Sequence, residues 1–427
     1  MTALVSPSKI NGILAAPSSK SSMQRACAAA LLHAGITHIY NAGTSNDDKA
    51  ALNIISLLGA TIHRQENNIS INSNGFSANS IPVENEISCG ESGLSIRMFA
   101  PIAALSSSAI TLTGTGSLLT RPMSFFDKIF PQLKVNIETN NGHLPLKING
   151  PLQPVNISID GSLSSQFLTG LLFALGASAT EIVTVFVKDL KSKPYIDLTL
   201  DVMNKFGYHI VNENYERFII NPKHIQQKNT INYVVEGDWS SASFLLVAGA
   251  IAGSVKVTGL DENSAQADKA IMQALKDCAA GININEDGIE ITKSDLKSFT
   301  FDATDCPDLF PPLVALAVYC KGTTIIKGTH RLAAKESDRA KTLQEIFGKM
   351  GIEISLQKDE MFITGGTVKS AEVSSHHDHR IAMAAAIAAL AANGNIEISN
   401  ADAINKSYPQ FYEDLKKLGT TIHLIQP

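Results

Sequence analysis

The sequence predicts an α/β protein of two domains, and its length, an internal repeat and the character of its helices support this. The chain has 427 residues, more than one ordinary hydrophobic core accommodates, so two domains of about 200 residues each are expected. Two kinds of segment recur six times each, and both join a predicted helix to a β-rich run. One kind of helix is apolar on nearly all sides, which is typical of a helix inside a protein.

The first repeated unit is a helix-like stretch that ends in glycine and precedes a short β-rich run. Glycine directly after a helix is the expected left-handed cap. These stretches carry Lys, Asp and Glu on one side, so we expect them outside the core. A sixth, weaker copy at 125–135 lacks the glycine. The five copies that end in glycine span residues 52–59, 198–207, 271–281, 343–351 and 411–419.

The second repeated unit is a strongly apolar helix, a turn of small residues and a β-branched strand. Alternation of the two units gives six β-α-β-α-β-β-like modules, with the apolar helices as the core and sheets around them. The predicted apolar helices span residues 23–33, 95–105, 166–175, 242–252, 309–320 and 380–392. The predicted strands after them span residues 37–40, 109–113, 182–187, 254–258, 323–327 and 395–399.

Charge and cysteine content exclude several classes of protein. The net charge of −5 argues against a general nucleic-acid binder, which would show a basic face. Five scattered cysteines form no CxxC pair, so buried free thiols in a reducing cytoplasm are expected. No basic segment followed by an apolar stretch opens the chain, and no window offers about 18 uninterrupted apolar residues. We therefore expect a cytoplasmic protein without a signal peptide or membrane span.

Polar residues rich in Ser, Asp and Gly stand directly before each of the six apolar helices. Ordinary N-capping explains most of them singly, because caps favour these residue types. Capping does not explain the cations in or near the first turns, where the helix dipole disfavours positive charge. These cations are Lys20, Arg25, Arg97 and Arg380. A bound anion would account for them, since free N–H groups at helix starts bind anions and Arg adds a bidentate fork.

The segment 335–339 places Glu336 between Lys335 and Arg339. One interpretation is a solvated helix start with pairing along the helix face. The other is a carboxylate held between cations, which suits proton transfer beside a bound phosphate.

Two further features are ambiguous or discounted. The segment 376–379, with three His and one Asp, resembles a metal cluster, but no second group with ligand spacing follows it, so no metal is expected. Trp239 is compatible with either a core residue or a lid.

Seven segments resemble motifs of the 5-enolpyruvylshikimate-3-phosphate synthase family. Residues 17–21, which read Pro-Ser-Ser-Lys-Ser and precede Arg25, are similar to the family's Pro-Gly-Ser-Lys-Ser…Arg start. Residues 192–195 resemble its Ser-Lys-Pro-Tyr. The other similar segments are 160–167, 236–242, 335–339, 378–380 and 406–409. They occur in order over nearly the whole chain, and together they are far more specific than any one alone.

The resemblance implies a fold of two similar domains, each with three β-α-β-α-β-β units and buried parallel helices, an inside-out α/β barrel. The chain of this family crosses between its domains twice. The implied domains are 1–18 with 237–427, which carries the catalytic carboxylates, and 19–236, which binds shikimate 3-phosphate. Helix starts of both are expected to face a substrate cleft.

The resemblance also implies an activity, the transfer of the enolpyruvyl group of phosphoenolpyruvate to the 5-hydroxyl of shikimate 3-phosphate. Phosphate is released through a tetrahedral intermediate, in the synthesis of chorismate and aromatic amino acids. The implied partners are these two small molecules alone, with no cofactor, no metal, no nucleic acid and no membrane, and the implied protein is a monomer.

Residue roles follow only from the resemblance. Asp308 matches the base at the attacking hydroxyl, Glu336 the carboxylate that moves the methyl proton, and Lys20 the cation that bridges both substrates. The shikimate 3-phosphate side matches Lys20, Ser21, Arg25, Ser164, Ser165, Gln166, Ser192, Tyr195, Asp308 and Lys335. The phosphoenolpyruvate side matches Lys20, Gly93, Arg97, Arg121, Gln166, Glu336, Arg339, Arg380 and Lys406.

A departure from the family's motif lies beside the implied phosphoenolpyruvate site, and two alternative functions remain. The family often reads Asn-Ala-Gly-Thr-Ala-x-Arg where residues 91–97 read Glu-Ser-Gly-Leu-Ser-Ile-Arg. One alternative is the related transferase that acts on UDP-N-acetylglucosamine, but that family carries a Cys on a mobile loop and the comparable segment 114–122 has none. The other is a non-catalytic anion-binding relative, which would not need both Asp308 and Glu336.

Overall fold

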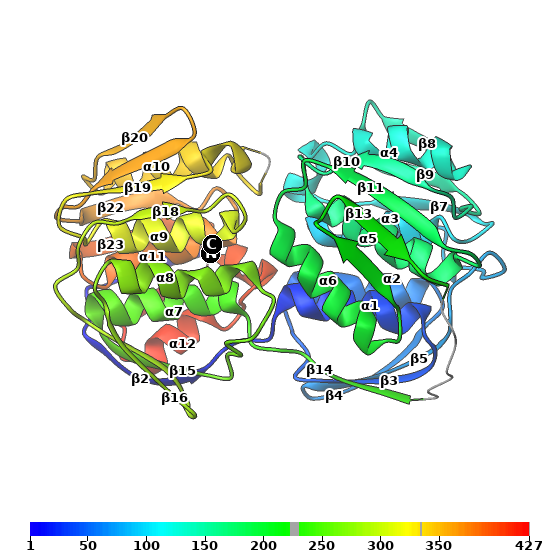
Figure 1. Cartoon of the computed structure of the whole chain (residues 1–427). Coiled ribbons are helices and arrows are strands. Elements are labelled where there is room, and N and C mark those ends of the chain that lie inside the picture. Colours follow the sequence, from blue (N-terminus) through cyan, green and yellow to red (C-terminus); the bar gives the residue numbers. More distant parts are fainter. Residues whose placement is uncertain (223–229, 334, 427) are drawn as a thin grey trace. The chain divides into compact units, whose positions relative to one another are not determined.

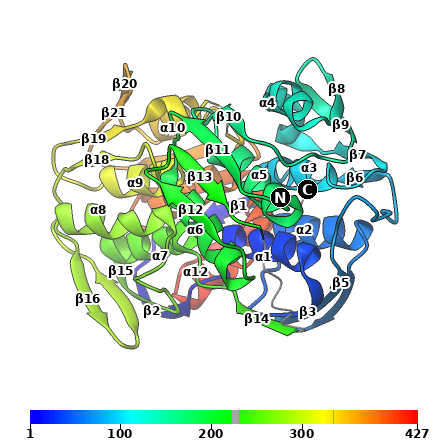
Figure 2. The same ribbon diagram turned by 45° about the vertical axis from the view of Figure 1, so that its right-hand side comes forward.

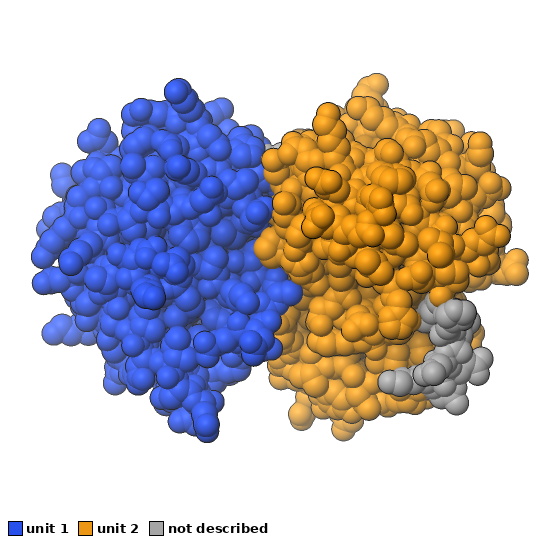
Figure 3. All heavy atoms as spheres, in the orientation of Figure 1, with its two compact units in different colours: residues 1–17, 237–427 blue, residues 18–236 orange. Residues whose placement is uncertain are grey.

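The computed structural model describes residues 1–222, 230–333 and 335–426, and the chain divides into two compact units (Figure 1). Unit 1 consists of Met1–Pro17 and Gly237–Pro427, and unit 2 of Ser18–Glu236 (Figure 3). The first division expected from the sequence lay one residue later, after residue 18.

The described residues form six four-stranded sheets, three in each unit, with one shared pairing scheme. In every sheet the first two strands are parallel and each later neighbour is antiparallel. The sheets of unit 2 are β14(Thr230–Val234)-β3(Ala34–Tyr40)-β5(Asn68–Asn74)-β4(Thr61–Gln65), β6(Glu86–Ser88)-β7(Ala109–Thr113)-β9(His143–Asn149)-β8(Asn136–Asn140) and β10(Ile157–Asp160)-β11(Val183–Lys188)-β13(Arg217–Ile220)-β12(Ile210–Glu213). Those of unit 1 are β2(Ile10–Ala15)-β15(Gly253–Thr258)-β17(Gly288–Thr292)-β16(Gly281–Asn285), β18(Thr300–Asp302)-β19(Thr323–Lys327)-β21(Glu360–Thr364)-β20(Ile354–Gln357) and β22(Lys369–Ser374)-β23(Asn393–Ser399)-β1(Thr2–Val5)-β24(Ile422–Ile425). The α/β class and the sixfold repeat predicted from the sequence are confirmed.

Each buried helix belongs to one repeat and packs on the sheet of that repeat (Figure 2). These helices are apolar on nearly all sides, and their residues are almost entirely buried, as predicted. Within each unit they contact one another in pairs and form the core. In unit 2 they are α1 (Lys20–Leu32), α3 (Gly93–Ala103) and α5 (Ser165–Ser178). In unit 1 they are α7 (Trp239–Ala252), α9 (Phe310–Ala317) and α11 (His379–Ala389).

The two passages between the units exchange one strand each. Strand β2 precedes α1 of unit 2 along the chain, yet it pairs with β15 of unit 1. Strand β14 precedes α7 of unit 1, yet it pairs with β3 of unit 2. Strands β1 and β24 pair with each other, so both ends of the chain lie in one sheet.

The second set of helices is amphipathic or short and ends as the glycine pattern predicts, with one correction. These helices are α2 (Asn46–Leu57), α4 (Ser124–Ile129), α6 (Lys193–Lys205), α8 (Ile271–Asp277), α10 (Arg339–Lys349) and α12 (Phe411–Lys417). Glycines 59, 207, 351 and 419 adopt positive φ after α2, α6, α10 and α12, which L side chains disfavour. After α8 the prediction of a glycine cap is wrong, because Ala279 takes the left-handed conformation at φ 63°. In the weaker copy Lys134 takes it at φ 61°.

The burial of the cysteines and of Trp239 can be compared with the predictions from the sequence. All five cysteines are buried free thiols, as expected. Trp239 is a core residue, only 1% exposed, and its indole N–H donates to the carbonyl of Asp261 at 3.0 Å. Across the described ranges, no helix has the length and apolarity that crossing a bilayer would take. The same residues contain no group of three or more His, Cys, Asp or Glu side chains placed to hold a metal ion.

Candidate active site

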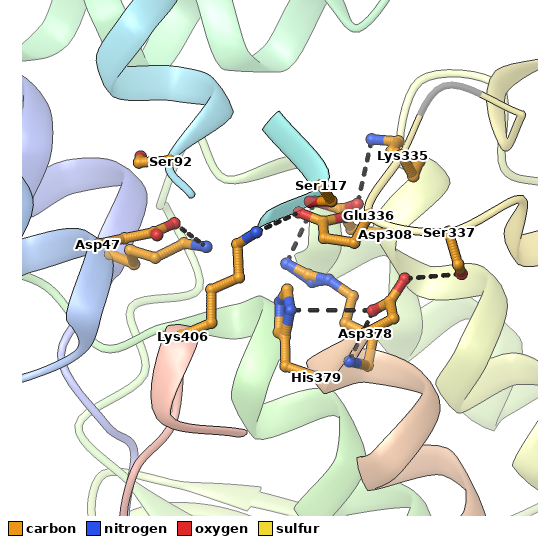
Figure 4. Close-up of polar contacts among 12 residues, drawn as sticks. Asp47, Ser92, Ser117, Asp308, Lys335, Glu336, Ser337, Asp378, His379 and Lys406 are labelled. Carbon is orange, nitrogen blue, oxygen red and sulfur yellow. Dashed lines mark hydrogen bonds and ion pairs between the residues drawn. The ribbon is translucent and has the colours of Figure 1, made fainter. Parts of the chain in front are cut away.

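Charged side chains from four segments of unit 1 meet where its helices begin (Figure 4). Asp308 lies on the short helix η4 (Pro307–Leu309) that leads into α9. Lys335 and Glu336 precede α10, whose first residue is Arg339. Asp378 is the N-cap of α11, Arg380 is in its first turn, and Lys406 ends the short helix η6 (Ala401–Lys406).

Arg339 lies at the centre of this cluster and is only 1% exposed. Its Nη1 donates to Asp308 Oδ1 at 2.8 Å, its Nη2 to Glu336 Oε2 at 2.6 Å and its Nε to Asp378 Oδ2 at 2.7 Å. Burial alone would lower the pKa of Arg339, but the three carboxylates raise it well above its ordinary value. The guanidinium therefore stays charged and holds the carboxylates in fixed positions.

Asp308 is surrounded by three cations. Besides Arg339, Lys335 Nζ lies 3.2 Å from its Oδ1 and Arg380 Nη2 lies 3.1 Å from its Oδ2. Burial would raise the pKa of this carboxyl, but the cations outweigh burial and hold it well below its ordinary value. Asp308 is thus ionised and weakly basic here, and an anionic ligand that neutralised its neighbours would make it a stronger base.

Glu336 also lies between cations, although not the pair that its sequence neighbours suggest. Lys335 turns to Asp308, whereas Lys406 Nζ lies 3.8 Å from Glu336 Oε1, opposite Arg339. The interpretation of a solvated helix face with pairing along α10 is therefore wrong for Lys335. Two adjacent cations favour the ionised form of Glu336, and anionic substrates that compensate these cations would let it carry a proton.

Asp378 ties two of these segments together, a role that the sequence did not reveal. Besides Arg339, its carboxylate accepts from the hydroxyl of Ser337 at 3.1 Å and caps α11 through the backbone N–H of Arg380 at 3.0 Å. In the sequence Asp378 reads as an ordinary N-cap. Its second role depends on a partner 39 residues away, which no local pattern shows.

A second buried carboxyl, Asp268, lies beside this cluster. It belongs to the short helix η3 (Ala267–Ala270) and accepts a hydrogen bond from Ser240, at the start of α7. Burial raises its pKa to about 6, with Asp308 adding to the effect and Arg380 opposing it. Asp268 was not predicted from the sequence.

In unit 2 the start of α1 carries the expected cations. Lys20 Nζ lies 2.9 Å from Asp47 Oδ2, in the first turn of α2. Arg25 is 1% exposed and donates to the carbonyls of Ser21 at 2.8 Å and Tyr195 at 3.2 Å. Burial lowers the pKa of Arg25 to about 10. The side chain of Arg25 therefore connects α1 to the beginning of α6, which Ser192 precedes as N-cap.

A second group in unit 2 gathers around the start of α3. Arg97 Nη1 donates to Gln166 Oε1 at 2.8 Å, and its guanidinium lies 5.1 Å from the centre of the Phe167 ring. A Cβ on Gly93 would overlap Arg121 Nη1 and lie 3.4 Å from Arg97 Nη1. The absence of a side chain at position 93 therefore lets the Arg121 guanidinium lie directly on the helix start.

Serines at the start of α5 lie next to Gln166. Ser164 is the N-cap and accepts from the backbone N–H of Gln166 at 3.3 Å. Ser165 is the first residue of the helix and is buried.

The chain itself supplies partners for several of the cations that suggested a bound anion. Lys20 pairs with Asp47, and Arg380 pairs with Asp308. The inference of a bound anion from the cations alone is thus incomplete. It did not include these carboxylates, because they come from segments distant in sequence. In unit 1 the cations Lys335, Arg339, Arg380 and Lys406 face Asp308, Glu336 and Asp378.

Comparisons with known proteins agree with this architecture. A profile of the EPSP synthase (3-phosphoshikimate 1-carboxyvinyltransferase) family matches residues 4–415. The 3-phosphoshikimate 1-carboxyvinyltransferase of Clostridium novyi is 38% identical to this chain over 423 residues, which cover 97% of each protein. An EPSP synthase structure from Acinetobacter baumannii superimposes with a TM-score of 0.84 at 26% identity, over 100% of both chains. An enolpyruvyl transferase from Streptomyces tendae superimposes with a TM-score of 0.77 over 99% of this chain and 98% of that one, and its 16% identity bears on the fold alone.

Proposed function

This chain belongs to the EPSP synthase family, and from that premise we propose that it transfers the enolpyruvyl group of phosphoenolpyruvate to the 5-hydroxyl of shikimate 3-phosphate. Phosphate is released, and the product feeds the synthesis of aromatic amino acids. The observation that carries this proposal is the pair of carboxylates, Asp308 and Glu336, held by one buried guanidinium. A protein that only bound anions would have no use for them.

In the proposed addition step, Asp308 accepts the proton of the 5-hydroxyl as its oxygen attacks C2 of phosphoenolpyruvate. Three cations weaken Asp308 as a base in the free chain. The negative charges of the substrates would compensate these cations and strengthen the base where it is needed. Glu336 delivers a proton to C3, which converts the methylene into a methyl group.

In the proposed elimination step, the methyl group returns a proton to Glu336, the C2–O bond to phosphate breaks, and Asp308 gives the hydroxyl proton to the departing phosphate, which restores both carboxyl groups. Lys20 stabilises the leaving phosphate, because a nearby ammonium lowers the energy of developing negative charge. Lys406 lies beside Glu336 and keeps that carboxylate ionised between the two proton transfers.

The remaining residues divide between the two substrates. We assign the phosphoenolpyruvate side to Gly93, Arg97, Arg121, Gln166, Arg339, Arg380 and Lys406, together with Lys20 and Glu336. Four hydrogen bonds to carboxylates commit most N–H groups of Arg339, so it mainly orients the two acids. We assign the shikimate 3-phosphate side to Lys20, Ser21, Arg25, Ser164, Ser165, Gln166, Ser192 and Tyr195 of unit 2, with Asp308 and Lys335 of unit 1. Arg25 contributes chiefly by orienting Ser21 and Tyr195.

We further propose that unit 1 supplies the acid–base groups and unit 2 most of the shikimate 3-phosphate contacts. The protein acts on these two small molecules as a cytoplasmic monomer and uses no cofactor. It binds no nucleic acid.

The experiment is phosphate release from phosphoenolpyruvate with shikimate 3-phosphate, with UDP-N-acetylglucosamine in a parallel reaction. We expect release with the shikimate substrate alone. Release only with UDP-N-acetylglucosamine would assign the chain to the related transferase reaction. No release with either would leave an anion-binding relative.

A further inference from the structure

The helix η1 (Gly116–Thr120), which follows β7, contacts the segment at the start of α3 at two points. At one end of η1, a Cβ on Gly116 would lie 2.7 Å from Glu91 Oε2 and closer still to the other carboxyl atoms. The carboxylate of Glu91 therefore covers the backbone of Gly116. At the other end of η1, Arg121 Nη1 lies on Gly93. Glu91 in the loop and Gly93, the first residue of α3, thus contact the two ends of one short helix.

Backbone hydrogen bonds and packing also join the loop to the residues before and within η1. The backbone N–H of Thr115 donates to the carbonyl of Gly90 at 2.8 Å, and that of Cys89 donates to the carbonyl of Thr113 at 2.9 Å. Leu118, in the middle of η1, is fully buried, and a Cβ on Gly114 would lie 3.0 Å from the carbonyl of Gly90. The loop and η1 are thus joined at several points, so a shift at one end of η1 is passed to the other.

The backbone at the start of η1 leaves room for the Glu91 carboxylate. Thr115 is the N-cap of η1 but makes no side-chain capping bond. Gly116 has φ 55°, so it combines a left-handed backbone with an open face on which the carboxylate rests.

We infer that Glu91 is a positioning residue for phosphoenolpyruvate: its carboxylate fixes η1 and thereby holds the Arg121 guanidinium over Gly93, beside Arg97. This inference rests on the proposed function, since it assigns the Arg97–Arg121 pair to that substrate. Displacement of a charged group by about 1 Å can cost up to 10²-fold in rate. Glu91 therefore sets the recognition of one substrate without touching it.

The experiment compares Glu91→Ala with the unmodified chain in steady-state kinetics for each substrate. We expect the KM for phosphoenolpyruvate to rise about tenfold or more, while the KM for shikimate 3-phosphate changes less than about twofold. Glu91→Gln keeps the size and an acceptor oxygen and should recover part of the effect. The exposed Glu86 of β6 provides the matched control, and Glu86→Ala should leave both KM values unchanged. Equal changes in both KM values would overturn the inference, because a merely structural residue would not separate them.

A double-mutant cycle with Gly116→Ala tests the contact itself. An alanine at φ 55° is strained in either background. With Glu91 present it also meets the carboxylate, so the loss of kcat/KM for phosphoenolpyruvate should be at least fivefold larger than in the Glu91→Ala background. Equal losses would show that Glu91 does not rest on Gly116. If Glu91→Ala does not fold, Glu91→Ser serves in both comparisons. Absence of turnover in the unmodified chain would refute the proposed function instead.

Discussion

The two units place their charges differently, although they share one pairing scheme and one kind of core. In unit 1 the cations are interleaved with carboxylates, and a single buried guanidinium contacts Asp308, Glu336 and Asp378. Around α3 of unit 2, Arg97 donates instead to the neutral amide of Gln166, and Arg121 lies against a glycine. The first arrangement suits proton transfer and the second suits binding of an anion. In the proposed reaction, one repeated scaffold thus supports two kinds of chemistry through the residues at its helix starts.

The largest effect should come from the carboxylates of unit 1. Asp308→Asn and Glu336→Gln keep the size of each side chain but remove its ability to take a proton. We expect kcat to fall about 10²- to 10⁴-fold in each, because general acid–base catalysis contributes that much. Phosphate release measures it. The exposed Glu372 of the same unit is the control, and Glu372→Gln should keep full turnover. Near-normal kcat in both carboxylate variants would remove the proton-transfer role from unit 1.

Substitution of Asp378 distinguishes the contribution of the ion-pair network to stability from that of ordinary helix capping. Asp378→Ala leaves the Nε of buried Arg339 without its carboxylate, and breaking a buried pair costs about 3–5 kcal/mol. Asp338 is the matched control, since it caps α10 in the same manner but is partly exposed. Asp338→Ala should cost only about 1 kcal/mol. Denaturant unfolding measures both, and equal losses would mean that the network adds nothing to the cap.

Each unit also holds a buried carboxyl with a raised pKa, and these predict a pH dependence of stability. Burial raises the pKa of Asp268 in unit 1 and of Asp48 in unit 2 to about 6. The folded chain then keeps a proton that the unfolded chain releases near pH 4. Stability should therefore fall as pH rises from about 4 to about 6, by at most about 3 kcal/mol per group.

Asp268→Asn and Asp48→Asn should each flatten this dependence. Asp308 acts in the opposite direction, since its pKa is lowered and its contribution is lost only below about pH 4. Thermal unfolding between pH 4 and 7 checks the sign. A stability that rises over this range equally in the variants and the unmodified chain would contradict the assignment.

The smallest effect concerns the anion-binding side of the comparison. Arg97→Lys keeps the charge but loses the planar fork that donates to Gln166. We expect the KM for phosphoenolpyruvate to rise about tenfold with a smaller change in kcat, since the charge that Lys keeps retains part of the roughly 1.5–3 kcal/mol that a charge-assisted hydrogen bond contributes. A large loss of kcat at unchanged KM would place Arg97 among the reacting groups.

The sequence reveals helix starts and cations better than it reveals their partners. The spacing of apolar helices and glycines is local, so the six modules and most helix ends follow from it. The pairs Lys20–Asp47 and Arg339–Asp378 join segments 27 and 39 residues apart. In the sequence Asp47 reads as an ordinary acidic residue of a first helical turn and Asp378 as an ordinary N-cap. Ala279 replaces a predicted glycine cap because α8 ends earlier than its apolar pattern suggests.

The sheets that β2 and β14 join could not be predicted from the local sequence pattern either. Both strands read like the opening strand of the module that follows them, and nothing in their composition says which sheet they join. Only the family resemblance indicated that the chain crosses twice. The same resemblance did not anticipate the contact between Glu91 and Gly116, because the chain departs from the family's motif at residue 91.

Incorporation of solvent deuterium tests the central claim most directly, the claim that unit 1 moves protons while the α3 region of unit 2 binds the anion. The reaction is run in D2O with saturating phosphoenolpyruvate, and deuterium at the vinyl carbon of the product is followed by NMR. We predict rapid incorporation for the unmodified chain and for Arg97→Lys, and at least 10²-fold slower incorporation for Glu336→Gln. Equal slowing in Arg97→Lys and Glu336→Gln, or undiminished incorporation in Glu336→Gln, would contradict it.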